Sequence, residues 1–217
     1  MRSVYNCATD KKSDVQQTLD SLHLKCKQFT YNDKPYKVIK YNKGLMTDDT
    51  VSTSGLFRSV IFYDGKICAF SPPKSVCEEK YMTAYSPNDG FAEEFIEGTM
   101  INVFFVPEVG DEGDWEISTR SGVGGRMTYF QNGAIRAEDT FRYMFLDACS
   151  KANLVFDKLD RKYCYTFVMQ HPNNRIVAPF YETNLFLVAA YQIDNEAYVV
   201  TEVPRQEQID MVASTNV

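Results

Sequence analysis

The most regular alternation of hydrophobic and polar residues in this chain lies between residues 95 and 105, FIEGTMINVFF. A period of two is typical of a β-strand whose two faces have different surroundings. With this period, Phe95, Glu97 and Thr99 share one face. Glu97 and Gly98 are locally unfavourable, because an unpaired carboxylate is costly to bury and glycine weakens a strand interior. Either something other than packing sets these residues, or Glu97 lies on a solvated edge and Gly98 forms a bulge.

Hydrophobic periodicity predicts two helices and a series of strands along the rest of the chain. Apolar residues at three- and four-residue spacing indicate amphipathic helices at 12–26 and 138–152. The predicted strands are 36–42, 56–63, 66–70, 115–120, 163–169, 175–180, 184–192 and 197–203. Asp64-Gly65 is a hairpin turn between two of them, and residues 121–125, SGVGG, are a flexible connection.

This order of elements predicts an α+β fold in which antiparallel sheets have flanking helices. Residues 1–203 are expected to form a single domain, and residues 204–217 a polar tail that frays. No apolar run reaches the ~18 residues that span a bilayer, and the first residues lack a signal peptide. We therefore expect a soluble protein of the cytoplasm, or of the host cytoplasm if viral, without a membrane partner.

Cysteine and histidine usage argues against a disulfide framework or a zinc site. The chain contains six cysteines without CxxC spacing and only two histidines. We therefore expect the cysteines to be small core residues. The sequence does not identify metal ligands.

The net charge of −6 is unevenly distributed. Residues 1–44 contain nine Lys or Arg against four Asp or Glu, a local charge of +5. Residues 78–116 contain eleven Asp or Glu against one Lys, a local charge of −10. A basic region can contact phosphates and an acidic one can hold Mg²⁺, although most such charges in proteins lie on a solvated surface.

Four segments, taken in order, carry a resemblance to a known family. They are LFRSVIF at 56–62 with FSPPK at 70–74, FIEGTM at 95–100, WEISTR at 115–120, and YTF at 165–167 through HPNNRIV at 171–177. The last run is the most specific. The set resembles the T4 phage RNA ligase family (RNA ligase 1-like), part of the covalent nucleotidyltransferase superfamily.

This resemblance implies a nucleotidyltransferase fold, the ATP-grasp-like fold of RNA and DNA ligases, with an ATP pocket between antiparallel sheets. Family enzymes form lysyl-AMP from ATP with Mg²⁺, and pass the AMP to an RNA 5′-phosphate before a 3′-hydroxyl seals the strand. ATP and Mg²⁺ are therefore the cofactors of an active enzyme, and nucleotide and RNA its ligands. By resemblance, the nucleotide-binding residues are Arg58, Glu97, Gly98, Thr99 and Arg120, and those for phosphate or nucleic acid are Lys74 and Arg175.

The chain departs from the family pattern at several positions. Phe95 stands where the family has its nucleophilic lysine, and a benzyl side chain has no lone pair to attack phosphorus. Val168 replaces a family carboxylate, and Ser59 an early glycine. Two later motifs, Glu-Gly-hydrophobic and Lys-x-Lys, are missing, so the fold is expected to be C-terminally truncated. Covalent chemistry is not expected unless a partner chain supplies these motifs, or an amine comes from Lys66, Lys74 or Lys80.

Two functions from different classes follow. The first is an RNA-ligase-like nucleotidyltransferase domain that binds ATP, another nucleotide or a nucleic-acid end. The alternative is a catalytically inactive structural or scaffold protein, a pseudoenzyme derived from the ligase fold of a virus or phage. The candidate residues also have structural interpretations: Arg58 on a strand edge, Arg175 capping a turn, Lys74 as a solvated loop lysine and His171 as a structural histidine.

Overall fold

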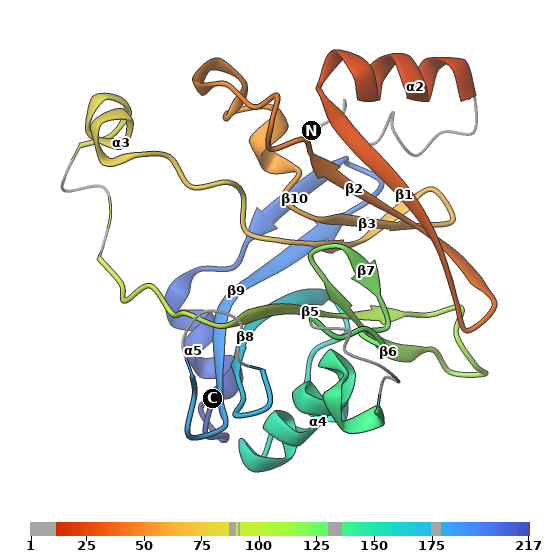
Figure 1. The fold of residues 1–217 in the computed structure, drawn as a ribbon, viewed down its shortest axis with the longest axis vertical. Helices are drawn as coiled ribbons and strands as arrows, with labels where there is room; N and C mark the ends of the chain where they lie inside the picture. The colour runs from red at the N-terminus through yellow and green to blue at the C-terminus, as the bar shows by residue number, and fades with distance from the viewer. Residues whose placement is uncertain (1–11, 87–89, 91, 130–135, 175–178) are drawn as a thin grey trace.

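The computed structural model describes residues 12–86, 90, 92–129, 136–174 and 179–217. Its strands form two antiparallel sheets (Figure 1). The four-stranded sheet follows chain order: β1 Leu24–Tyr31, β2 Lys34–Tyr41, β3 Val60–Tyr63 and β4 Lys66–Phe70. Asp64 and Gly65 both have positive φ, as a two-residue turn of type I′ requires, so the predicted hairpin between β3 and β4 is confirmed.

The six-stranded sheet has the order β10-β9-β8-β5-β6-β7. Its strands are β5 Thr99–Val106, β6 Asp114–Thr119, β7 Gly122–Val123, β8 Tyr163–Gln170, β9 Asn184–Asp194 and β10 Val199–Glu202. β5 lies inside this sheet, where it pairs with β6 on one side and β8 on the other. The antiparallel sheets confirm the predicted α+β class, and β6 is confirmed as the hairpin partner of β5.

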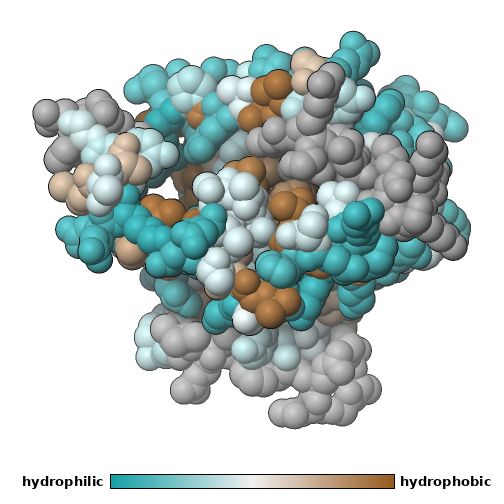
Figure 2. All heavy atoms as spheres, turned by 90° about the horizontal axis from the view of Figure 1, so that it is seen from above, coloured by the Kyte–Doolittle hydropathy of each residue, from teal (hydrophilic) through white to brown (hydrophobic). Residues whose placement is uncertain are grey.

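The helices of the described residues lie outside the sheets. They are α2 Lys12–Ser21, α3 Glu78–Ala84, α4 Phe141–Lys151 and α5 Arg205–Val212, with 3₁₀ turns at Asp48–Thr50, Ser54–Leu56, Ala137–Asp139 and Phe156–Lys158. α3 buries none of its residues and stands apart from the sheets (Figure 1). Seen from above, hydrophilic residues cover most of the surface, and hydrophobic groups form small separate areas (Figure 2). None of the described helices has the length and apolar character needed to cross a membrane.

The two sheets pack face to face, and α4 covers the outer face of the six-stranded sheet. Period two along β5 directs Asn102 and Phe104 toward the four-stranded sheet, and Ile101 and Val103 toward α4. The core between the sheets includes Tyr36, Val38, Ile61, Ala69, Phe104 and Val106. The core under α4 includes Ile101, Val103, Phe141, Met144, Phe145 and Ala148. β5 therefore contributes to both cores.

Two predicted strands begin later than their sequence pattern indicated. β5 begins at Thr99, and residues 95–98 do not join it, so the predicted shared face of Phe95, Glu97 and Thr99 does not form. The reason is Gly98, whose φ of 153° suits glycine and interrupts the strand. β3 likewise begins at residue 60 rather than 56, because a 3₁₀ turn precedes it, so Arg58 lies before the strand.

Both predicted helices were too long. The first ends at Ser21 rather than 26, because Leu24 already pairs with Tyr41 in the β1–β2 ladder. The second begins at Phe141 rather than 138, because Thr140 caps it. The Thr140 hydroxyl accepts a hydrogen bond from the backbone N–H of Tyr143 at 3.2 Å, which satisfies a donor of the first turn.

Two segments have more regular structure than their composition suggested. The connection at 121–125 contains β7, which pairs with β6. The chain end that was expected to fray contains α5, which buries Gln208 and contacts the core through Met211 and Val212. In the strand predicted at 175–180, residues 175–178 lie outside the described residues, and 179–180 form no strand.

The cysteines divide into two groups. Cys149 and Cys164 are buried, as expected of core residues, whereas Cys26 and Cys77 are exposed, contrary to that expectation. The five described cysteines all carry free thiols.

Four polar side chains form a buried network between the two sheets. The Asn102 amide on β5 donates to the Ser71 hydroxyl at 2.8 Å, and its carbonyl oxygen accepts from the Thr166 hydroxyl at 2.9 Å. Ser118 on β6 lies 3.4 Å from the same amide nitrogen. All four residues are fully buried, so each polar group depends on the others for its hydrogen bonds. The network therefore fixes β5 against β8, β6 and the end of β4.

Asn102→Ala is expected to lower the free energy of unfolding by about 3 kcal/mol, because it removes two hydrogen bonds and leaves buried hydroxyls without their partner. Urea denaturation measures the change. The control Thr83→Ala removes an exposed hydroxyl on α3 and should change stability by less than about 0.5 kcal/mol. Equal effects of the two substitutions would contradict a stabilising role for the network.

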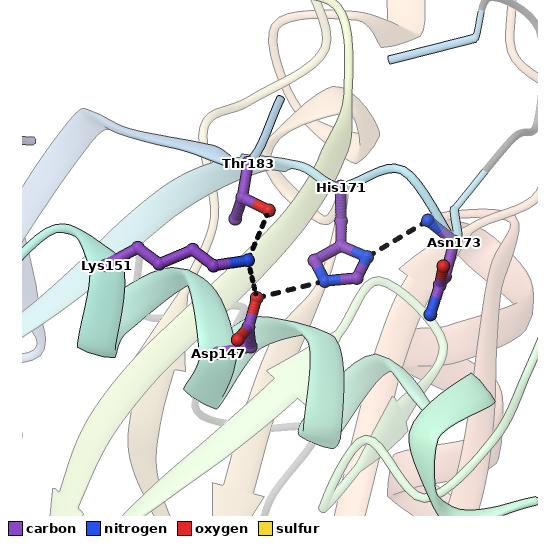
Figure 3. Close-up of polar contacts among 5 residues, drawn as sticks. All are labelled: Asp147, Lys151, His171, Asn173 and Thr183. Carbon is purple, nitrogen blue, oxygen red and sulfur yellow. Dashed lines mark hydrogen bonds and ion pairs between the residues drawn. The ribbon is translucent and has the colours of Figure 1, made fainter. Parts of the chain in front are cut away.

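A second polar cluster connects α4 to the ends of β8 and β9 (Figure 3). His171 Nε2 lies 3.1 Å from an Asp147 carboxylate oxygen, and His171 Nδ1 accepts from the backbone N–H of Asn173 at 3.1 Å. Since Nδ1 accepts, the neutral ring carries its proton on Nε2. Lys151 Nζ donates to the same Asp147 oxygen at 2.6 Å and to the Thr183 hydroxyl at 3.1 Å. These contacts hold the chain after β8, as expected of a structural histidine.

The environment of this cluster favours neutral His171 and ionised Asp147. Burial lowers the pKa of His171, although the hydrogen bond to Asp147 opposes that change. The hydrogen bond from Lys151 lowers the pKa of Asp147, with a further contribution from His171. Both groups have folded-state pKa values below their unfolded ones. The stability they contribute is therefore present above the unfolded pKa and is lost as the pH falls.

We expect the protein to lose stability on acidification from about pH 7.5 to about pH 5.5, around the ordinary histidine pKa of ~6.5. His171→Gln should flatten this part of the profile, because the titrating ring is gone. Thermal unfolding at a series of pH values measures it. His23 is exposed with positive φ, so His23→Asn is a matched control that should leave the slope unchanged. An unaltered slope in His171→Gln would exclude His171 as its source.

Candidate functional site

A cleft of about 750 Å³ lies where β5 begins, β8 ends and β9 begins. The segment before β5 runs past α5 at this place (Figure 1). The walls come from separate parts of the chain: Arg58 and Pro72, residues 93–98 with Met100, Val168, residues 186–188, and Arg205, Gln208, Ile209, Val212, Ala213, Thr215 and Val217. The cleft is therefore assembled only when both sheets and the C-terminal helix have folded.

Gly98 determines the shape of the loop at the mouth of the cleft. A Cβ atom at this position would lie 2.6 Å from the Met169 carbonyl oxygen and 2.7 Å from a Val168 methyl group, so only glycine fits. The Gln170 amide donates to the Glu97 carbonyl oxygen at 2.9 Å and fixes the loop from the other side. Phe95 is left 85% exposed at the edge of the cleft. The ring therefore makes little contact with the rest of the protein and borders the opening of the cleft.

The charged groups that line the cleft are more acidic than basic. Glu93, Glu94 and Glu97 face two arginines, and one of these, Arg205, already forms an ion pair with Glu93. Burial raises the pKa of nearby Glu202, and the charge of Glu93 raises it further. Arg58 is the cation without an ion pair among the described lining residues.

Arg58 lies in the wall of the cleft and comes from the turn before β3. It is half-buried, and its Nε atom is buried without a hydrogen-bond partner in the described part of the chain. Burial raises the pKa of Tyr191, and the charge of Arg58 opposes that rise. A buried guanidinium nitrogen that lacks an acceptor is costly.

The remaining lining residues are mostly apolar. Val168, Phe186 and Val188 come from the strands of the six-stranded sheet, and Ile209 and Val212 from α5. An apolar cleft with few polar groups is the usual surrounding of a small organic ligand. A flat, weakly charged group such as a nucleobase fits this lining better than a polyphosphate does.

The structure brings some of the sequence-predicted residues together and separates others. Arg58, Glu97 and Gly98 line the cleft, together with Phe95. Thr99 lies on the opposite face of β5, where its hydroxyl accepts from the Asn174 amide at 2.6 Å.

The other predicted residues do not line the cleft. Lys74 is exposed and donates to the backbone and side-chain oxygens of Ser75. Arg120 lies over the ring of Tyr41, with its guanidinium carbon 5.0 Å from the ring centre. Arg175 lies outside the described residues.

Sequence reasoning missed the wall that α5 contributes. Its residues belong to the segment interpreted as a polar tail, whose low hydrophobicity hid the helix. The available signal was the spacing of Ile209 and Val212, three residues apart and both facing the cleft.

Two side chains of the cleft bear on the covalent chemistry that the family resemblance implies. Phe95 offers no nucleophile, and Val168 offers no carboxylate beside the cleft. Among the described residues, no group of three or more His, Cys, Asp or Glu is arranged to hold a metal ion.

No protein-family model matches the chain. The chain is similar to an RNA ligase of Rhodothermus phage RM378, with 28% identity over 120 residues. The match covers 54% of this chain and 26% of that ligase, so the chain spans about a quarter of the length of the relative. This similarity supports a distant relationship to a phage RNA ligase.

Proposed function

We propose that this chain is an RNA-ligase-like domain that binds a nucleotide, or the phosphorylated end of a nucleic acid, without forming a covalent intermediate. The observation that carries this proposal is the cleft in which Arg58, Glu97 and Gly98 meet beside exposed Phe95. The similarity to a phage RNA ligase supports it. The segments that contain these three residues also resemble motifs of the T4 phage RNA ligase family.

The charges of the cleft favour a ligand with one phosphate. A single phosphate can accept charge-assisted hydrogen bonds from Arg58, which forms no ion pair among the described lining residues. A base or ribose can pack on Val168, Phe186 and Val188. A triphosphate would bring more negative charge close to the three glutamates, where like charges repel. AMP and a 5′-phosphorylated end therefore suit this cleft better than ATP.

AMP should bind more tightly than ATP when Mg²⁺ is absent, and Arg58→Gln should weaken AMP binding about tenfold, through loss of one charge-assisted hydrogen bond of ~1.5 kcal/mol. Isothermal titration calorimetry measures both. Arg161 lies over the Phe105 ring, away from the cleft residues, so Arg161→Gln is a control that should bind AMP normally. Tighter binding of ATP, or an unchanged affinity in Arg58→Gln, would contradict the proposed mode.

Incubation with Mg²⁺ and ATP labelled at the α-phosphate should leave no label on the denatured protein. The reason is that Phe95 has no amine with which to form lysyl-AMP. Gel electrophoresis under denaturing conditions detects the adduct. A labelled band that disappears in Lys66→Ala, Lys74→Ala or Lys80→Ala would overturn the non-covalent proposal and identify the reacting amine. ATP and Mg²⁺ would then be its cofactors.

The alternative is a structural or scaffold protein derived from the ligase fold. Phe95 at the position of the family nucleophile favours this alternative, because an enzyme that forms lysyl-AMP needs a lysine there. If neither AMP, ATP nor 5′-phosphorylated RNA binds at millimolar concentration, this alternative replaces the binding function. A partner chain that supplies the missing motifs would instead restore labelling when it is added.

A further inference from the structure

Four basic side chains meet at a seam between the two sheets, apart from the residues that line the cleft. Lys25 and Lys40 are directly opposite each other in the β1–β2 ladder. Lys27 is two residues after Lys25 on the same strand, so the three lysines share one face of the four-stranded sheet. Both strands contact β7 at this end, which brings the β6–β7 turn to the same face.

The β6–β7 turn adds the fourth cation. Lys40 Nζ donates to the hydroxyl of Ser121 in this turn at 2.8 Å. Arg120, the preceding residue, lies over the Tyr41 ring, and its Nε atom is buried without a hydrogen-bond partner in the described part of the chain. Arg120 was expected at the nucleotide, and the structure places it with the lysines instead.

These four cations lack the carboxylate partners that usually accompany clustered lysine and arginine side chains. Within the described residues, none of Lys25, Lys27, Lys40 and Arg120 forms an ion pair with a carboxylate, in contrast to Lys80, Arg136, Lys151 and Lys162. Burial lowers the pKa of Lys40, and the charges of Arg120, Lys27 and Lys25 lower it further. Like charges opposite one another destabilise a sheet. A bound anion would remove this repulsion and supply the acceptors that are missing.

The long side chains of the group are partly ordered by aromatic rings. Lys27 Nζ lies 4.4 Å from the centre of the Phe29 ring, and Arg120 lies 5.0 Å from that of Tyr41. Cation–π contacts restrict these side chains, which reduces the entropy lost when they bind a ligand. A positively charged groove or row is typical of proteins that follow the backbone of a single-stranded nucleic acid.

We propose that Lys25, Lys27, Lys40 and Arg120 form a binding site for the phosphodiester backbone of a single-stranded nucleic acid. The site is a row of cations rather than a closed pocket, which suits a repeating anion better than an isolated one. The protein as a whole carries a net charge of −6, so its overall electrostatic field repels a polyanion. Binding of a nucleic acid therefore depends on this local group of cations. The site stands independently of what the cleft binds.

The test is fluorescence anisotropy of a labelled single-stranded RNA without a terminal phosphate, at salt concentrations between about 50 and 200 mM. If four cations contact phosphates, the logarithm of the affinity should fall with the logarithm of the salt concentration with a slope of about −2.8, at ~0.7 per contact. The exposed pair Lys25→Gln/Lys27→Gln should reduce this slope by about 1.4. DNA of the same sequence should bind within a few-fold, because backbone contacts ignore the base and the 2′-hydroxyl.

The matched control is Lys158→Gln/Lys162→Gln, which removes the same charge from exposed lysines at another site. The proposal is overturned if wild-type protein does not bind RNA at the lowest salt, if the slope is unchanged in the Lys25/Lys27 variant, or if the control loses as much. Polyglutamate that binds as tightly as RNA would make the group a general anion site and overturn the assignment to nucleic acid. Calorimetry with AMP is unaffected by any of these outcomes, so the cleft is judged separately.

Discussion

The contact of Gly98 with the end of β8 is the constraint on which the rest of the site depends. Because the Met169 carbonyl leaves no room for a side chain at Gly98, the chain turns there and β5 starts only at Thr99. The loop before the turn then lies over the cleft, with Phe95 at its edge. The strand after the turn carries Asn102 into the network between the sheets. One close backbone approach therefore sets both the mouth of the cleft and the register of the central strand.

Acidic and basic side chains gather at two different places in the structure. The cleft has three glutamates against two arginines, and one arginine is already paired. The seam of β1, β2 and the β6–β7 turn has four cations without carboxylate partners among the described residues. The uneven charge of the sequence thus has a spatial counterpart.

Features set by neighbouring residues were predictable from the sequence, and features set by distant ones were not. The Asp64-Gly65 turn followed from two adjacent residues. The start of β5 was not predictable from neighbouring residues. The backbone at Gly98 lies against the Met169 carbonyl on another strand, and this contact leaves no room for a side chain. For the site, the resemblance to ligase motifs had grouped Arg58, Glu97 and Gly98, and these three residues line one cleft. It could not separate Thr99, which the pleat directs to the other face, or Arg120, which packs on Tyr41.

The position of α5 links the cleft to the local stability of a short helix. Its residues form one wall, yet few of them are deeply buried, so the helix belongs to the less stable part of the fold. Undocking of this wall would leave the cleft open on one side. A ligand that requires the wall must favour its docked state and slow amide exchange along the last turns of the chain. The last residues of the chain, which also line the cleft, would then be held in place by the ligand.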